Sequence, residues 1–211
     1  MNTLTEQQIT KALEGFATVR HIYNSAVKEV TTKIEILDDE FHSHFDHNPI
    51  HHIESRLKSP LSIAKKLEKN GLEVSLESAT ENLYDIAGIR IICHYIDDVY
   101  HVADMILGQS DVTLLRGKDY IKNPKPNGYR SLHLTISIPV FFSDGRKDVP
   151  VEVQIRTIAM DFWASLDHEL RYKATNVPED AVTRLRECAE KMSALDEEMQ
   201  DIRALCLEEK K

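Results

Sequence analysis

Aromatic, basic, acidic and amide side chains share one face of two adjacent segments whose alternation is typical of β-strands. Residues 131–142 and 148–156 alternate apolar with polar side chains, and Asp144-Gly145 between them is typical of a hairpin turn. If the strands pair, both apolar sides must meet one core, so both polar sides lie together. The polar face then carries Tyr129, His133, Glu152, Gln154 and Arg156, while Arg130 has the opposite parity and no assigned role.

These side-chain types suit the binding of a nucleotide. An aromatic ring can stack on a base, and histidine or arginine can donate hydrogen bonds to phosphate. A carboxylate such as Glu152 can hold Mg²⁺ or accept a proton. Pattern alone leaves a second interpretation open, in which the polar face of an antiparallel sheet is simply exposed to water.

A further carboxylate and arginine accompany the segment DIAGIRIICHY, residues 85–95, which reads as a buried strand. Arg90 is costly inside such a strand unless it pairs with an acidic group or points into a ligand site. Gly88 would let a backbone or a ligand approach closely. Asp85 could equally be a turn residue, because alternation does not fix the face on which it lies.

Positive charge is concentrated in two segments of an acidic chain. The net charge of −9 argues against a protein that binds long DNA without sequence preference. Residues 56–69 nevertheless hold five lysines and arginines against one acid, and residues 118–130 hold four against Asp119 alone. Because charges are screened beyond roughly 8 Å at physiological salt, these clusters predict a pocket for a compact polyanion. RNA binding is possible, but no feature supports it.

Helical and strand patterns alternate along the chain, which predicts one α/β or α+β domain over residues 1–211. Apolar spacing predicts a long helix over 5–41, and Ser59-Pro60 and Gly71 are typical of the two ends of the next helix. The expected elements that follow are a helix over 76–83, a helix capped by Asp97 that stops at Gly108, a strand near 111–116 and a polar loop over 117–128.

Two more helices are expected after the hairpin. Thr157 would cap a helix that runs to about Lys173, with a core stripe of Ile158, Phe162, Leu166 and Leu170, and with Trp163 as packing. The last helix, about 178–208, repeats apolar residues in steps of four and three, which is typical of a coiled-coil seam. The long terminal helices favour assembly into an oligomer, although their seams could also be core. The seam of the last helix comprises Ala181, Leu185, Cys188, Met192, Leu195, Met199, Ile202 and Cys206.

Several features bear on location and metals. The three cysteines lack short spacings, which favours reduced thiols in a cytoplasmic protein. No apolar run reaches about 18 residues, and the N-terminus lacks the pattern of a signal peptide. The tract HSHFDHNPIHH, residues 42–52, reads as a loop with five histidines, and its composition leaves transition-metal binding open.

Several motifs in correct order resemble the RelA/SpoT-type (p)ppGpp synthetases over roughly residues 46–173. They are RLKSPLSIAKKL, DIAGIRIIC, GYRSLHL, VEVQIRTIAMDFWASLDH and the following YK. The length is similar to that of a small alarmone synthetase, and KPNGYRSLHL and HNPI resemble the RelP-like branch more than the RelQ-like branch. The resemblance implies a nucleotidyltransferase-like mixed sheet flanked by helices, a homotetramer, and Mg²⁺.

The activity that the resemblance implies is transfer of the β,γ-pyrophosphate of ATP to the 3′-hydroxyl of GTP or GDP, with release of AMP. The hydrolase motif of the family is not found, so a synthetase without hydrolase activity is expected. The alternative is a catalytically silent relative that binds nucleotide or RNA, which the presence of both Asp85 and Glu152 disfavours.

The resemblance also implies roles for individual residues. Asp85 and Glu152 would bind Mg²⁺, and Glu152 is the candidate base for the 3′-hydroxyl. Gln154 would assist, and Asp161 falls where the RelQ-like pattern has an asparagine near guanine. The residues implied for ATP are Arg56 and Arg90 around adenine, with Lys58, Lys66 and Lys69 at the phosphates. Those implied for GTP or GDP are Tyr129, stacked on guanine, with Lys118, Lys125 and His133 at the phosphates.

Overall fold

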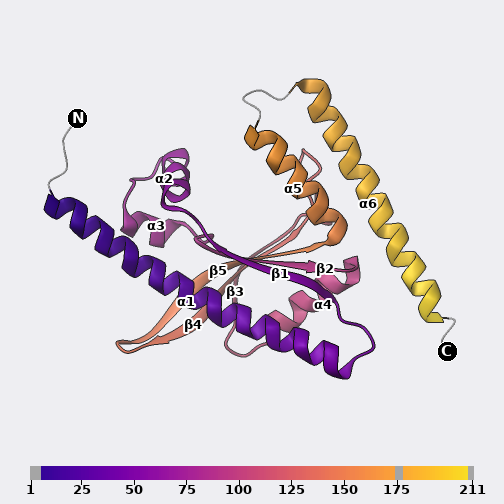
Figure 1. Cartoon of the computed structure of the whole chain (residues 1–211), viewed down its shortest axis with the longest axis horizontal. Coiled ribbons are helices and arrows are strands. Elements are labelled where there is room, and N and C mark those ends of the chain that lie inside the picture. The colour runs from indigo at the N-terminus through magenta and orange to yellow at the C-terminus, as the bar shows by residue number, and fades with distance from the viewer. Residues whose placement is uncertain (1–5, 174–177, 209–211) are drawn as a thin grey trace.

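The protein is described by a computed structural model that covers residues 6–173 and 178–208. Within these residues, five strands form one mixed sheet in the order β1-β2-β5-β4-β3 (Figure 1). The parallel pair is β2 with β5, and the other neighbours are antiparallel, which confirms the predicted fold class. The strands are β1 Ile50–Leu57, β2 Ala87–Cys93, β3 Thr113–Asp119, β4 Leu132–Phe142 and β5 Gly145–Thr157.

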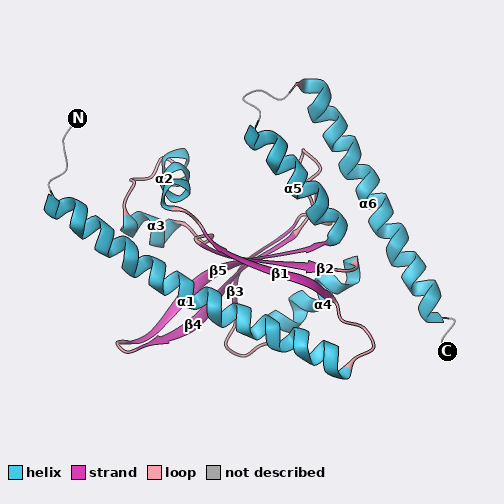
Figure 2. Cartoon of the chain, viewed as in Figure 1, coloured by secondary structure: helices cyan, strands magenta, loops and turns pink. Residues whose placement is uncertain are grey.

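Helices flank the sheet along one face and at both ends (Figure 2). Helices α1 and α4 contribute to the same core as the apolar side chains of β4 and β5, so they pack on the apolar face of the sheet. In Figure 1, α2 and α3 lie together toward one end of the sheet, and α5 and α6 lie toward the other. The helices are α1 Glu6–His44, α2 Pro60–Lys69, α3 Leu76–Asn82, α4 Ile96–Leu107, α5 Ile158–Lys173 and α6 Glu179–Glu208. None of these helices is both long and apolar enough to span a lipid bilayer, as judged over the described part of the chain.

The alternation predicted for the hairpin is confirmed. Leu134 pairs with Val153 and Ile136 pairs with Val151, and these four side chains are at most 4% exposed. Gly145, the first residue of β5 after the turn, has a φ of 125°, a conformation that other residues rarely adopt. Because one face of both strands is buried against α1 and α4, the register is fixed and the polar residues share the opposite face.

Predicted element boundaries are confirmed where a local hydrogen bond sets them. Ser59 caps α2 by accepting a hydrogen bond from the backbone N of Ser62 at 3.3 Å, and Gly71, with a φ of 70°, follows the end of that helix. The prediction that Asp97 caps α4 is wrong. Tyr95 is the capping residue, and its backbone N donates to the Asp98 carboxylate at 3.2 Å.

Two loop predictions are wrong because neighbouring helices or strands extend into them. The histidine-rich tract 42–52 begins inside α1 and ends inside β1, so only its middle is a loop. Strand β3 lies at residues 113–119 rather than near 111–116, which places Lys118 on the sheet, opposite His133. Pairing with β4 provides the backbone hydrogen bonds that stabilise this otherwise polar strand.

The predicted core stripe of α5 is also wrong. Ile158, Phe162, Leu166 and Leu170 are 44–57% exposed, whereas Trp163 is 5% exposed. Trp163 packs with Ala164 against Ala189 of α6, and its indole N donates to the Leu185 carbonyl at 2.8 Å. The helix is therefore rotated relative to the expectation, because α6 covers the neighbouring side of α5.

Helix α6 docks through only part of its seam. Ala189 and Asp196 are buried, and the Asp196 carboxylate accepts a hydrogen bond from the Thr157 hydroxyl at 2.5 Å. Arg130 donates to the Ala189 carbonyl at 3.4 Å, so this residue joins the start of β4 to α6. The seam residues Leu195, Met199 and Ile202 remain 43–53% exposed, which leaves an apolar surface available to a second chain.

Candidate active site

Two rows of side chains cross the polar face of the sheet, and strand register places them side by side. Directly paired residues on neighbouring strands point to the same face, so each row can be followed across all five strands. The first row is Arg56, Gly88, Glu152, Thr135 and Arg116. The second row is Glu54, Arg90, Gln154, His133 and Lys118.

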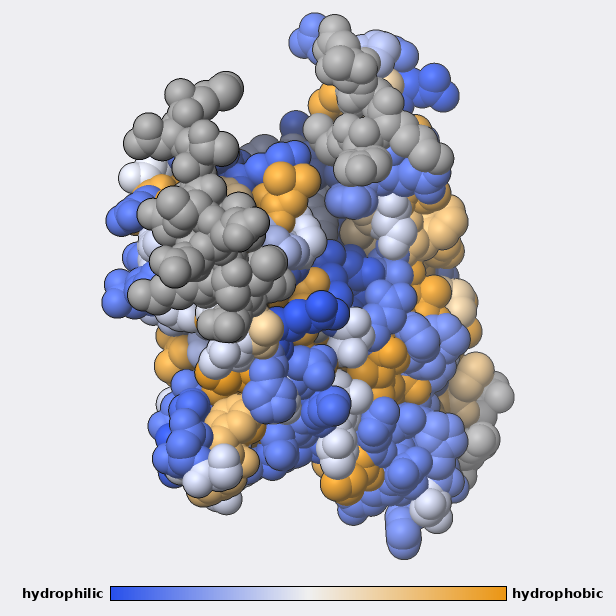
Figure 3. Space-filling model, turned by 60° about the vertical axis from the view of Figure 1, so that its left-hand side comes forward, coloured by the Kyte–Doolittle hydropathy of each residue, from blue (hydrophilic) through white to orange (hydrophobic). Residues whose placement is uncertain are grey.

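The larger cavity beside these rows has a volume of about 680 Å³, which lies in the range of small-ligand sites. Figure 3 shows a face of the protein that is hollowed along its middle, where mostly hydrophilic residues gather. The cavity brings together six of the predicted residues: Lys66, Asp85, Lys118, Lys125, His133 and Glu152. Its remaining lining residues are Asn70, Asn82, Tyr84, Leu115, Arg116, Tyr120 and Thr135.

A second, much smaller cleft of about 50 Å³ lies on the β1 and β2 side of the same face. It contains the predicted residues Arg56, Arg90 and Gln154. Asp85 and Glu152 line both the cavity and the cleft, so the two carboxylates form a wall shared by the two spaces. We call the 680 Å³ space the large cavity and the 50 Å³ space the small cleft.

Two lysines hold Asp85 at the shared wall. The Nζ atoms of Lys58 and Lys66 each lie 2.5 Å from Asp85 Oδ2. Burial raises the pKa of Asp85, but the hydrogen bonds and charges of Lys58 and Lys66 outweigh this, and the pKa lies below its ordinary value. Asp85 is therefore an anion at neutral pH.

Glu152 is held from the opposite side. His133 Nδ1 lies 3.4 Å from Glu152 Oε1, and the Gln154 amide donates to Glu152 Oε2 at 2.8 Å. Burial raises the pKa of Glu152, but His133, Gln154 and the charge of Lys66 lower it to about 2. The second carboxylate of the wall is thus also ionised at neutral pH.

The shared wall fits a hard divalent cation. Asp85 Oδ1 is buried and makes no hydrogen bond, although Oδ2 is bound by two lysines. Mg²⁺ is commonly bound by one or two carboxylates together with substrate phosphates and water. An unpartnered carboxylate oxygen beside an ionised Glu152 is the donor set that such an ion requires.

The histidine-rich tract does not form a comparable site. Across residues 6–173 and 178–208, no three or more His, Cys, Asp or Glu side chains are grouped so that they could hold a metal ion. His47 instead binds the Asp98 carboxylate at 2.9 and 3.0 Å, and His42 contacts the Asp38 carbonyl at 2.9 Å. The structure therefore gives no support to transition-metal binding by this tract.

Aromatic rings and a lysine line the far side of the large cavity. The rings of Tyr120 and His133 meet edge to face with centroids 5.2 Å apart. The Lys125 ammonium lies 4.6 Å from the Tyr120 centroid and 4.5 Å from the Tyr129 centroid. Tyr129 is therefore placed next to the cavity by Lys125, which lines it.

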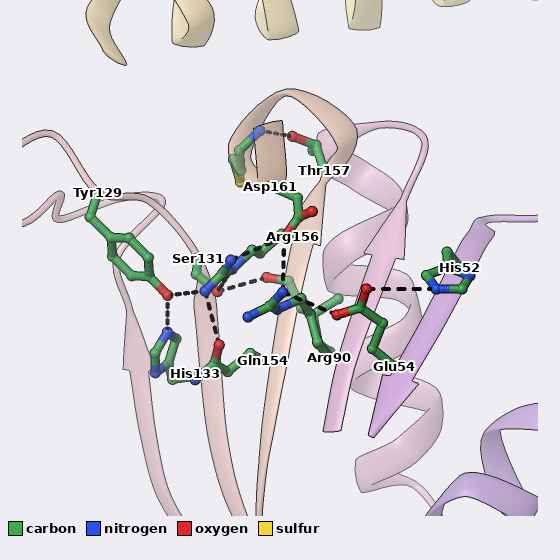
Figure 4. Close-up of polar contacts among 12 residues, drawn as sticks. His52, Glu54, Arg90, Tyr129, Ser131, His133, Gln154, Arg156, Thr157 and Asp161 are labelled. Atoms are coloured by element: carbon green, nitrogen blue, oxygen red, sulfur yellow. Dashed lines mark hydrogen bonds and ion pairs between the residues drawn. The ribbon is translucent and has the colours of Figure 1, made fainter. Parts of the chain in front are cut away.

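Arg156 is the centre of the hydrogen bonds drawn in Figure 4. It is 5% exposed, and its guanidinium donates to the Tyr129 hydroxyl at 2.6 Å, to Gln154 Oε1 at 2.9 Å and to Asp161 Oδ1 at 3.1 Å. Arg90 approaches the same oxygen of Asp161 at 3.6 Å and donates to Glu54 at 3.1 Å. Of the two alternatives for Arg90, the structure shows pairing with acidic groups, namely Glu54 and Asp161, and Arg90 also lines the small cleft.

Four predicted residues line neither space: Tyr129, described above, and Lys58, Lys69 and Asp161. Lys69 is exposed in the last turn of α2 and lines neither the large cavity nor the small cleft. Asp161, in the first turn of α5, is engaged by Arg156 and Arg90 rather than open to the large cavity. Lys58 lines neither space either, but its ammonium reaches the shared wall through Asp85.

Tyr120 and Arg116 line the large cavity but were not predicted. Alternation along residues 131–142 does place Thr135 on the polar face, so that lining residue could have been found from the pattern. Arg116 and Tyr120 could not, because the register of β3 shifts between Leu114 and Arg116. Such an irregularity changes which side chains face the cavity and leaves no sequence signal.

Known proteins are similar to this chain in both sequence and fold. Residues 55–177 match the family model described as the region found in RelA/SpoT proteins. The chain is 45% identical over 183 residues to the GTP pyrophosphokinase YwaC of Bacillus subtilis, covering 86% of this chain and 87% of that protein. It is 39% identical to GTP pyrophosphokinase YjbM of the same organism, covering 86% and 85% of the two chains. The crystal structure of small alarmone synthetase 1 from Bacillus subtilis bound to its product pppGpp is similar, with a TM-score of 0.84, 37% identity, and 90% and 96% of the two chains covered.

Proposed function

The chain belongs to the RelA/SpoT family and is a small alarmone synthetase, and on this premise we propose how its residues carry out the GTP pyrophosphokinase reaction. The reaction transfers the β,γ-pyrophosphate of ATP to the 3′-hydroxyl of GTP or GDP and yields (p)ppGpp and AMP. One observation carries the assignment of roles. Asp85 and Glu152 line both spaces, so nucleotides bound on the two sides meet at the two carboxylates.

ATP is assigned to the small cleft and the adjoining lysines. Arg56 and Arg90 come from neighbouring strands and both line this cleft, so their guanidinium planes can enclose adenine. Lys58 and Lys66 sit at the inner end, where the β- and γ-phosphates must lie to reach the acceptor. Lys69 is exposed on the same helix and would meet only the outer part of a triphosphate.

The acceptor GTP or GDP is assigned to the large cavity. Lys118, Lys125 and His133 line it and supply positive charge for the 5′-phosphates. Tyr129 offers its ring to guanine from beside Lys125, as base stacking on an aromatic side chain requires. Gln154 supports the acceptor side by holding Glu152 through a 2.8 Å hydrogen bond.

Asp85 and Glu152 are the proposed ligands of Mg²⁺. The ion would supply neutralisation of the charge on the transferred pyrophosphate. In its absence, the two lysines on Asp85 and the histidine beside Glu152 keep both carboxylates ionised and available. Glu152 is also the residue placed to accept the proton of the 3′-hydroxyl. A pKa of about 2 makes it a weak base, so displacement of His133 by acceptor phosphates would raise its basicity.

Incubation of the protein with Mg²⁺, ATP and GTP tests the activity and the role of Glu152 together. Wild type should release AMP and form a pentaphosphate guanosine, resolved by anion-exchange chromatography. Glu152→Gln should lower kcat by about 10²-fold to 10⁴-fold, the range typical of a lost acid–base group. Glu73→Gln, an exposed position between α2 and α3, is the matched control and should retain wild-type activity. Nucleotide binding without product in wild type would identify a silent relative instead.

We propose in addition that the enzyme is a cytoplasmic homotetramer whose assembly uses α6. The support is the apolar stripe formed by Leu195, Met199 and Ile202, which is exposed in the single chain. Leu195→Asp should lower the mass measured by light scattering, and the exposed Asp201→Asn on the same helix should not. An unchanged mass for Leu195→Asp would exclude this surface from the interface.

A further inference from the structure

A buried arginine joins the two halves of the site. Arg156 lies at the end of β5 and is 5% exposed, yet it lines neither the large cavity nor the small cleft. On one side it binds the Tyr129 hydroxyl, and on the other it binds Asp161, which Arg90 also approaches. A guanidinium is costly to bury, and four polar partners, including Ser131 and Gln154, compensate for that cost (Figure 4).

On the acceptor side, Arg156 sets the direction of a chain of hydrogen bonds. A guanidinium can only donate, so the Tyr129 hydroxyl oxygen accepts from Arg156 at 2.6 Å. The proton of that hydroxyl is then free to be donated to His133 Nε2, which lies 2.7 Å away. If Nε2 accepts this hydrogen bond, the ring proton of His133 is on Nδ1, which lies 3.4 Å from Glu152 Oε1. The position of the Tyr129 ring and the tautomer of His133 thus follow from Arg156.

On the donor side, Arg156 and Arg90 share one carboxylate oxygen. Asp161 Oδ1 lies 3.1 Å from Arg156 Nη1 and 3.6 Å from Arg90 Nη1. Because both guanidinium groups contact this one oxygen, a movement of Arg156 that displaces Asp161 also changes the contact between Asp161 and Arg90. The Nε atom of Arg90 is also buried without a hydrogen-bond partner, so the hydrogen-bonding capacity of this side chain is not fully used in its present position.

We propose that Arg156 is a positioning residue that couples the acceptor and donor nucleotide sites through Tyr129 and Asp161, an inference that rests on the function proposed above. When guanine stacks on Tyr129, the ring and Arg156 become fixed together. Asp161 then stays in place, and Arg90 is held in position for adenine. The second nucleotide therefore binds to a site that has already lost part of its conformational freedom, which gives positive cooperativity.

Calorimetric titration measures the coupling directly. The donor probe is α,β-methylene-ATP with Mg²⁺, titrated with and without saturating GDP. In wild type, GDP should tighten binding of the probe by about fivefold or more, as expected for coupled sites. In Arg156→Gln the factor should fall below about twofold. Arg156→Lys should also lose the coupling, because an ammonium keeps the charge but cannot replace the planar fork.

The matched control is Arg146→Gln. Arg146 is an exposed arginine on the hairpin that pairs with Asp148, far from the hydrogen bonds of Arg156 in the strand register. It should keep the wild-type coupling factor. Retention of that factor by Arg156→Gln, or its absence from wild type, would overturn the proposal.

A double-mutant cycle covers the case in which Arg156→Gln does not fold. Tyr129→Phe removes only the hydroxyl, and Asp161→Asn weakens the carboxylate, and both of these groups bind Arg156. If Arg156 couples them, the loss of kcat/KM in the double variant should differ from the product of the single losses by about threefold or more. Independent losses would refute the coupling. Absence of product with wild type would instead refute the proposed function, so the two failures are distinguishable.

Discussion

The large cavity and the small cleft differ in how far they are formed before a ligand binds. The large cavity has about 680 Å³ and is lined by five basic side chains, namely Lys66, Arg116, Lys118, Lys125 and His133. The small cleft has only about 50 Å³, and one of its two arginines is tied to Glu54 and Asp161. The proposed acceptor site is thus open before a ligand binds, whereas the proposed donor site must release or shift Arg90 before adenine can enter.

The shared wall is held differently on its two sides. Lys58 and Lys66 hold Asp85, whereas His133 and Gln154 hold Glu152. Each set of substrate phosphates will compete for the groups that now neutralise one carboxylate. Binding on either side would therefore change the charge of the wall, where we propose that the reaction takes place.

The largest expected effect concerns the wall itself and is seen as a dependence of stability on pH. The pKa of Glu152 is about 2 in the folded protein against an ordinary value of 4.5, so ionised Glu152 favours the folded state. This contribution is complete above pH 4.5 and is lost as the pH falls toward 2. It amounts to roughly 3 kcal/mol, at about 1.4 kcal/mol for each pKa unit.

Urea denaturation at pH 7, 4.5 and 3 measures this contribution. The free energy of unfolding of wild type should fall more steeply below pH 4.5 than that of Glu152→Gln. Glu73→Gln should follow the wild-type curve. Parallel curves for wild type and Glu152→Gln would show that His133 and Gln154 do not stabilise the ionised form of Glu152.

A smaller effect separates the two sites kinetically. Arg56→Ala removes one of the two guanidinium groups of the small cleft and should raise the KM for ATP by roughly tenfold, since cation–π contacts contribute about 1–2 kcal/mol when desolvated. The KM for GTP should change less than about twofold, because Arg56 does not line the large cavity. An equal rise in both values would remove the distinction between the spaces. Arg146→Ala is the control.

The smallest expected effect tests whether the donor site is restrained. Glu54→Gln removes an ion pair with Arg90 in which Glu54 is 53% exposed, so the pair contributes about 0.2–1 kcal/mol. Freed Arg90 should admit adenine more readily and lower the KM for ATP up to about fivefold. Exposed Glu77→Gln on α3 is the control. A higher KM for ATP would indicate that Glu54 helps to position Arg90 instead.

Prediction from the sequence succeeded where burial of one face of a strand requires apolar and polar residues to alternate. Alternation in the hairpin placed His133, Glu152 and Gln154 on one face, and register confirms it. It failed for α5, where Phe162 was expected in the core and is 57% exposed. Apolar residues occur on more than one side of that helix, so periodicity could not identify the side that α6 would cover.

The sequence by itself determined the family, the fold class and the set of polar residues on the face of the hairpin, because these depend on motifs and on the two-residue period of strands. Only the tertiary structure decided that Asp85 and Glu152 form a wall between two spaces and that Arg156 joins them. Those relations depend on the register of β2 against β5, and on the position of Asp161 at the start of α5. Strand register and helix docking are fixed by packing across the whole core, and no local pattern encodes them.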